Sequence, residues 1–134
     1  MSSDAQTIVP ASHLDLLSAP VVAHIATIGP DGAPQSSPVW FDWDGARLIL
    51  GMVESRQKLR NLRRDPHVAA SIVDPTNQNR YLEIRGLATF VPDPNREVLG
   101  RLMRKYTGTD NPSWPDSNER IIVAIEPTHT TQQG

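Results

Sequence analysis

Short β-forming segments, separated by turns rich in proline and glycine, limit the folds that this chain can adopt. Twelve prolines and eight glycines in 134 residues favour short strands over a bundle of long helices. The strongest turn signal is Gly-Pro-Asp-Gly at residues 29–32, between two segments rich in β-formers. The predicted strands span residues 21–28, 35–41, 47–53, 68–73, 81–91 and 120–126. This pattern predicts a mainly β protein, a small six-stranded antiparallel barrel.

Two of these strands contain a residue that disturbs regular pairing. Pro38 has no N–H to donate to a ladder, so its strand is expected to be at an edge of the sheet, to be bulged, or to face something other than another strand. Gly86 is expected to bend or bulge the longest strand. Between the strands we predict a turn at residues 42–45 and a polar loop at residues 74–79.

Three short helices are predicted around this barrel, and the chain reads as one domain. The helices span residues 10–18, residues 55–65 and a segment that begins after Pro92-Asp93-Pro94. The last helix repeats apolar residues at helical spacing: Leu99, Leu102, Met103 and Tyr106. A loop at residues 107–118 follows it. We expect a flexible N-terminal tail at residues 1–9, a single domain at 10–127 and a C-terminal tail at 128–134.

The helix predicted at residues 55–65 is strongly basic. It holds five of the chain's thirteen basic residues, and Ser55 is its expected N-cap. Arg56 and Lys58 fall in the first turn, where the positive end of the helix dipole opposes cations unless an anion is bound. These two residues therefore predict an anion site. The later arginines are expected to form a solvated face: Arg60, Arg63 and Arg64.

Composition and motifs argue against several other functions. Without cysteine the chain has no disulfide, thiolate metal ligand or cysteine nucleophile. The four histidines lack metal-ligand spacing and no nucleophile elbow is present, so we predict no metal site and identify no catalytic residue. A net charge of −2 argues against nucleic-acid binding. No apolar run reaches the roughly 20 residues of a membrane span and no signal-peptide pattern is evident, so we expect a cytoplasmic protein that binds no membrane.

A family resemblance extends over residues 11–126. It is carried by Arg-Gln-Lys-Leu-Arg-Asn-Leu-Arg-Arg-Asp-Pro at residues 56–66, Val-Ala-Ala-Ser-Ile-Val-Asp at 68–74 and Tyr-Leu-Glu-Ile-Arg-Gly at 81–86. With the preceding β-meander, these segments resemble the pyridoxamine-phosphate-oxidase-like split β-barrel flavoproteins. Within that group the chain most resembles actinobacterial oxidoreductases that use the deazaflavin coenzyme F420, which share the Arg-x-Lys spacing. The FMN-dependent members carry adjacent Arg and Lys, whereas Gln57 precedes Lys58 here.

The resemblance implies a homodimer that holds its cofactor between the two subunits. Arg56 and Lys58 are then expected to hold the cofactor's phosphate, with a polar contact from Asn61. Residues 36–40 are expected along the ring, and residues 79–81 are expected to reach across from the partner. The cofactor-binding residues implied in this way are Ser36, Ser37, Pro38, Val39, Trp40, Met52, Val53, Arg56, Lys58, Asn61, Asn79, Arg80 and Tyr81.

The function implied is that of an F420-dependent oxidoreductase, which transfers a hydride from the reduced cofactor to a small organic acceptor. One alternative is an FMN-binding oxidase or flavin reductase of the same fold. A second alternative is a haem- or cofactor-binding protein that is not an enzyme. A third is a protein that binds nucleic acid or an acidic partner through the later arginines, which the net charge disfavours.

Overall fold

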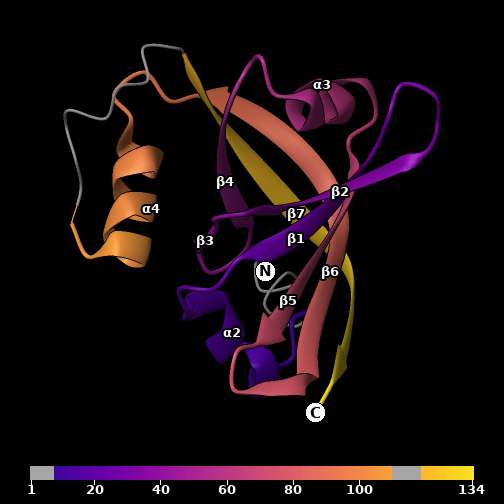
Figure 1. Cartoon of the computed structure of the whole chain (residues 1–134), viewed down its shortest axis with the longest axis vertical. Helices are drawn as coiled ribbons and strands as arrows, with labels where there is room; N and C mark the ends of the chain where they lie inside the picture. Colours follow the sequence, from indigo (N-terminus) through magenta and orange to yellow (C-terminus); the bar gives the residue numbers. More distant parts are fainter. Residues whose placement is uncertain (1–7, 110–118) are drawn as a thin grey trace.

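In a computed structural model of the chain, the structure describes residues 8–109 and 119–134. These residues form one antiparallel sheet with short helices around it (Figure 1). The strands are β1 (Ala23–Ile28), β2 (Pro34–Val39), β3 (Asp42–Trp43), β4 (Leu48–Val53), β5 (His67–Asp74), β6 (Asn77–Pro92) and β7 (Arg120–Gln133). The helical segments are η1 (Ala11–His13), α2 (Asp15–Ser18), α3 (Gln57–Arg64) and α4 (Glu97–Thr107).

The sheet curls into a barrel that is open between its two edge strands. The strand order is β2-β1-β5-β6-β7-β4-β3, so β2 and β3 are the two edges. Val39 ends β2 and Asp42 begins β3, so the ends of these two edge strands lie within about 11 Å of each other, the reach of three peptide units. Because β2 and β3 are not paired with each other, the barrel is split at this point.

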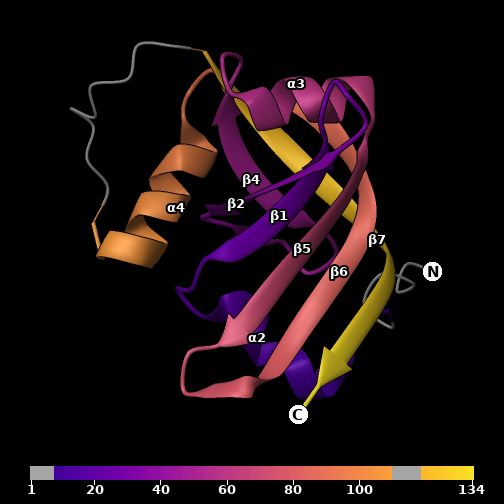
Figure 2. The same ribbon diagram turned by 45° about the vertical axis from the view of Figure 1, so that its right-hand side comes forward.

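The core fills the barrel, and α3 covers one of its ends. Alternate residues of the strands face inward, as in β5, where Val68, Ala70 and Ile72 are buried. Leu59 and Leu62 of α3 are fully buried in the same core, which confirms the leucine stripe of the basic helix. Helix α4 lies outside the barrel and packs on β4 and β7, where Val98 and Leu102 join a smaller apolar cluster (Figure 2).

All six predicted strands are present, but the sheet has seven strands among the described residues, so the six-stranded prediction was wrong. The additional strand is β3, at the start of the predicted turn, where Asp42 pairs with Ile49 and Trp43 with Leu48. The turn itself lies further along, where the Asp44 carboxylate accepts hydrogen bonds from the N–H groups of Ala46 and Arg47.

Two other predicted boundaries were also wrong. The polar loop at residues 74–79 is a tight turn, because Asp74 pairs with Asn77 and β6 begins there. Strand β7 continues through residues 128–133, where a polar tail was expected, and Gln133 pairs with Tyr81. In the predicted N-terminal tail, Val9 is buried in the core, while residues 1–7 lie outside the described part of the chain. Most of the predicted loop at 107–118 lies outside it as well.

Of three predictions from single residues, one was confirmed, one was right only in its position and one was wrong. Strand β2, which contains Pro38, is an edge strand. The register of β6 against β7 shifts at Arg85 and Gly86, where an irregularity was expected, but the extra residue is Thr128, so the bulge lies in β7 opposite Gly86 and not in the longest strand. Ser55 is not the N-cap of α3: that position is held by Arg56, and no side chain caps the helix.

Candidate anion and cofactor site at the split of the barrel

Two adjoining cavities lie at the split, and Arg56 and Lys58 line both of them. The ring-side cavity has a volume of about 200 Å³ and is lined by Pro38, Val39, Trp40, Gly51, Met52, Arg56, Lys58, Leu99, Leu102 and Arg120. The polar cavity has a volume of about 560 Å³ and is lined by Thr27, Gln35, Ser36, Ser37, Arg56, Gln57 and Lys58. One site thus has an apolar wall on one side and hydrogen-bonding groups on the other.

The structure brings together eight of the thirteen residues that the resemblance implied. They are Ser36, Ser37, Pro38, Val39, Trp40, Met52, Arg56 and Lys58, and each lines at least one of the two cavities. Val53 is buried beside Met52 and lines neither cavity. The sequence analysis did not select Thr27, Gln35 and Gln57 in the polar cavity, or Gly51, Leu99, Leu102 and Arg120 in the ring-side cavity.

The shared wall of the two cavities is cationic. Arg56 has an extended backbone at the N-cap of α3, and Lys58 follows in the first turn. Burial, and secondly the nearby Arg56 charge, lower the pKa of the Lys58 ammonium from its ordinary value. Among the described residues that line the cavities none is acidic, so nothing on their walls neutralises these cations. A bound anion would do so, with the first-turn N–H groups as further donors.

Asn61 does not face this site as a ligand. Its side chain is fully buried and its amide is already fully engaged. The Asn61 Nδ2 donates to Thr27 Oγ1 (2.9 Å) and to Gln35 Oε1 (2.6 Å). Its Oδ1 accepts hydrogen bonds from Gln57 Nε2 (2.8 Å) and Arg64 Nη2 (3.2 Å). Asn61 therefore holds two residues that line the polar cavity on β1 and β2, and one on α3.

Trp40 is held at the ring-side cavity by helix α4. Its ring stacks on that of Tyr106, with the centroids 4.8 Å apart and the planes 3° from parallel. The Tyr106 hydroxyl donates to the Val21 carbonyl (2.7 Å) and accepts from the Phe41 N–H (3.1 Å). Burial raises the pKa of Tyr106 above its ordinary value, so the group remains a neutral phenol that can donate. Helix α4 also supplies Leu99 and Leu102, which form an apolar wall of the ring-side cavity.

The three remaining predicted residues lie at the other end of the sheet. Figures 1 and 2 show the β5–β6 hairpin opposite to α3, and residues 79–81 follow its turn. Arg80 is bound within its own chain, to Asp15 (2.6 Å), to Asp74 (2.9 Å) and to the Ser12 carbonyl (2.7 Å). Asn79 is exposed and Tyr81 is half-buried. A single chain therefore does not bring residues 79–81 to Arg56 and Lys58.

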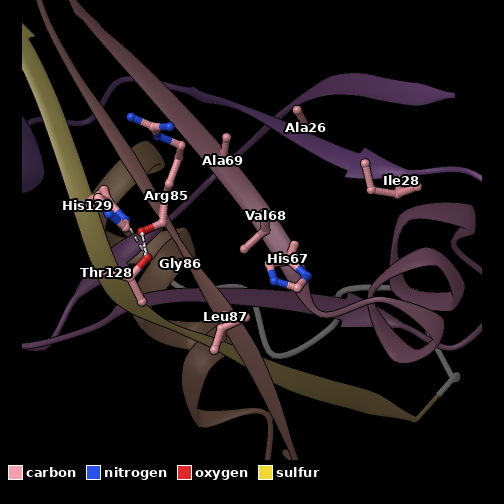
Figure 3. Close-up of a pocket in the computed structure, with 10 residues that line it drawn as sticks. All are labelled: Ala26, Ile28, His67, Val68, Ala69, Arg85, Gly86, Leu87, Thr128 and His129. Carbon is pink, nitrogen blue, oxygen red and sulfur yellow. Dashed lines mark hydrogen bonds between the residues drawn. The ribbon is translucent and has the colours of Figure 1, made fainter. Parts of the chain in front are cut away.

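A further cavity, of about 520 Å³, lies on strands β1, β5, β6 and β7 (Figure 3). It is lined by Ala26, Ile28, His67, Val68, Ala69, Arg85, Gly86, Leu87, Thr128 and His129, none of which was predicted to bind the cofactor. His67 lies 2.7 Å from Asp65, and this hydrogen bond is the main reason why the pKa of Asp65 is lowered. In the described part of the chain, no group of three or more His, Cys, Asp or Glu side chains is placed to hold a metal ion. None of the helices described there is long and apolar enough to cross a membrane.

Comparison with known proteins identifies the family. The model of the pyridoxamine 5'-phosphate oxidase family matches residues 9–134. The chain belongs to this family. A solved structure named F420 reductase shares 39% sequence identity and a TM-score of 0.84, over 92% of this chain and 98% of its own. A conserved hypothetical protein from Mycobacterium tuberculosis shares 28% identity with a TM-score of 0.75, over 94% of this chain and 85% of its own.

A more distant match shows the fold alone. General Stress Protein 26 from Bacillus anthracis has 16% identity and a TM-score of 0.68, over 90% of this chain and 94% of its own. The expected family and its split-barrel fold are thus confirmed.

Proposed function

We propose that this protein is an oxidoreductase that binds coenzyme F420 at the split of the barrel and reduces a small organic acceptor. The observation that carries this proposal is the pair of adjoining cavities that share Arg56 and Lys58. A cofactor with a flat ring and a phosphate needs this combination of an apolar wall and a cationic, donor-rich wall. The similar structure named F420 reductase supports F420 as the cofactor.

Each part of the site has a role in this proposal. Arg56 and Lys58 hold the phosphate, as charge-assisted donors. The ring lies against the wall formed by Trp40, Met52 and the leucines of α4, which also keeps water away from it. When bound, the cofactor supplies the hydride chemistry. Among the described residues that line the cavities there is no carboxyl or imidazole group, so we assign no catalytic residue and propose solvent as the proton source.

The second candidate is FMN, in an oxidase or flavin reductase with the same site. The observation that carries the first candidate also supports this one, because FMN likewise has a flat ring and a phosphate. The haem alternative has less support, because no histidine, the usual axial ligand, is among the described residues that line the two cavities.

We further propose that the protein works as a homodimer. Residues 79–81 lie at the end of the sheet opposite to α3, so they contact the cofactor only if a second subunit supplies them. The third cavity, together with Leu87 and Val91, which are 40% and 53% exposed, gives the sheet an apolar surface on which a second copy would pack.

Titration of the purified protein with F420, FMN and haem, followed by absorbance and fluorescence, tests the choice of cofactor. We expect the tightest binding with F420. The Lys58→Ala variant is expected to lose about 10- to 100-fold in affinity for F420, the effect of removing a charged hydrogen-bond donor. Its matched control is Arg63→Ala, because Arg63 is paired with Glu54 (2.6 Å) and lines neither cavity. If Lys58→Ala binds both F420 and FMN as tightly as the wild type, the proposed site is wrong.

A further inference from the structure

A continuous chain of side-chain hydrogen bonds runs from the surface of α3 into the polar cavity. Arg60 Nη2 donates to Gln57 Oε1 (2.7 Å), and Gln57 Nε2 donates to Asn61 Oδ1 (2.8 Å). Asn61 Nδ2 then donates to Gln35 Oε1 and to Thr27 Oγ1. Thr27 is 2% exposed and Asn61 is fully buried, so the last links of this chain are shielded from water.

Every bond in this chain points the same way, and its first member fixes the direction. An arginine side chain can only donate, so Gln57 must accept with its carbonyl oxygen, which leaves its –NH₂ group to donate to Asn61. Arg64 imposes the same orientation on Asn61, because it also donates to Asn61 Oδ1 (3.2 Å). The Asn61 –NH₂ group must therefore face Gln35 and Thr27, which accept from it.

The end of the chain is consequently a set of donors. The Gln35 carbonyl oxygen is used by Asn61, so its –NH₂ group is the part of this amide that remains for a ligand in the cavity. Thr27 accepts with its oxygen and keeps its own hydrogen to donate. Hydrogen bonds aligned in this way also polarise and strengthen one another.

We propose that Asn61 is a positioning residue, oriented directly by Arg64 and, through Gln57, by Arg60. Asn61 turns Gln35 and Thr27 into donors toward the polar cavity. The cavity is therefore selective for a ligand group that only accepts hydrogen bonds, such as a phosphate oxyanion. Gln35 is then a ligand of the phosphate, and Asn61 acts through it. This inference rests on the proposed function for the identity of the cofactor, but not for the anion chemistry of the cavity. It also gives Arg60 and Arg64 a function, although neither lines the ring-side cavity or the polar cavity.

A double-mutant cycle with Gln35→Met and Asn61→Leu tests the link between these two residues, with inorganic phosphate as the probe and calorimetry as the measurement. Each single variant is expected to bind phosphate about tenfold more weakly, as for the loss of one hydrogen bond to a charged group. The double variant is expected to be weakened clearly less than the product of the two single losses, because Asn61 acts in part through the amide that Gln35→Met has removed. Losses that multiply in the double variant would show that Asn61 has only a structural role and would overturn the proposal.

A second set of variants leaves the buried residue untouched, in case Asn61→Leu does not fold. Arg60→Met combined with Arg64→Met removes Arg64, which donates to Asn61, and Arg60, which orients Gln57, the other donor to Asn61. Arg60→Met combined with Arg63→Met removes the same charge from α3, but Arg64 still donates to Asn61. We expect the first pair to lose about tenfold in phosphate affinity and the second pair to lose about twofold or less. Equal losses would mean that only the bulk charge of the helix matters, which contradicts the proposal.

The same measurements separate this inference from the proposed function. Phosphate binding with the expected cycle, but no binding of F420 or FMN by the wild type, would overturn the cofactor assignment and support the role of Asn61. Tight binding of F420 by the wild type, with phosphate-affinity losses that multiply in the double variant, would support the cofactor assignment and overturn the role of Asn61. A wild-type protein that does not bind phosphate at all would overturn the role of Asn61.

Discussion

Lys58 is the residue whose pKa should respond most directly to an anion bound in the polar cavity. Its pKa is lowered by burial and by Arg56, and the charge of a bound anion would favour the protonated amine instead. We expect its pKa to rise when phosphate is added, and phosphate affinity to fall as the pH increases through the lowered pKa, because the neutral amine carries no charge. NMR titration of the side-chain carbon next to the amine measures this directly, since the chain has only two lysines.

The second lysine is an internal control for this measurement. Burial also lowers the pKa of Lys105, but its ammonium donates to the Phe41 carbonyl (2.7 Å) and does not line either cavity. Phosphate is therefore expected to leave the pKa of Lys105 unchanged. A parallel change in both lysines would point to a general effect of ionic strength, and an unchanged pKa of Lys58 would contradict its role at the phosphate.

At the level of residues, the sequence predicts the cations of the site better than its neutral donors. Two cations in the first turn of a helix are a local signal, which needs no knowledge of the fold. Asn61 was misassigned because helical spacing indicates a shared face but not which neighbours bury it. Gln35 was missed, although a signal exists: it is paired with Thr27 in the predicted hairpin of β1 and β2, so the two side chains are neighbours.

At the level of elements, the backbones of β6 and β7 come unusually close together at Gly86, opposite the bulge in β7. A Cβ atom on Gly86 would lie 2.1 Å from the Glu126 carbonyl oxygen. We expect Gly86→Ala to lower the free energy of unfolding by about 3 kcal/mol or more, because the atom in its way belongs to the backbone and has little room to move. Urea denaturation, followed by fluorescence, measures the change.

Gly51→Ala is the matched control on a neighbouring part of the sheet. A Cβ atom on Gly51 would have its nearest contacts at 3.5 Å and 3.6 Å, all with side chains, which is ordinary van der Waals contact. We expect its stability to stay within about 1 kcal/mol of the wild type. If Gly86→Ala were as stable as this control, the result would contradict the close approach of Gly86 to the Glu126 backbone.

The missed strand boundaries have a common physical cause. Strand β3 has two residues and the last part of β7 is polar, so neither shows the run of alternating apolar residues that predicts a strand. Both are strands because a longer neighbour pairs with their backbone: β4 with β3, and β6 with the end of β7. The longer strands, which bury one face in the core, were all predicted.

At the level of the whole molecule, the proposed dimer divides each site between two chains. A dimer with Lys58→Ala in one subunit and Tyr81→Ala in the other has one site that lacks both side chains and one that is intact. Equal mixing, unfolding and refolding of two inactive variants should therefore restore about a quarter of the sites, as expected for random pairing in a two-fold dimer. Cofactor binding to the mixture measures the restored fraction.

Neither variant is expected to bind the cofactor tightly when it is refolded alone, and light scattering should give the mass of two chains. A monomeric protein, or a mixture that binds no better than its two components, would contradict a site shared between subunits. A Tyr81→Ala variant with normal affinity would show that the partner's hairpin does not reach the cofactor.

The position of β4 in the sheet has a consequence for the order in which the molecule assembles. This strand supplies Gly51 and Met52 to the ring-side cavity, but its neighbours are the two-residue β3 and the final strand, β7. Met52 pairs with Ile121, about 70 residues further along the chain, so this wall of the cavity depends on a contact of long sequence separation. Arg56 and Lys58 are synthesised early, yet the ring-side cavity is complete only after β7 has been made and has paired. If the proposed site is right, the chain can therefore bind its cofactor only late in folding.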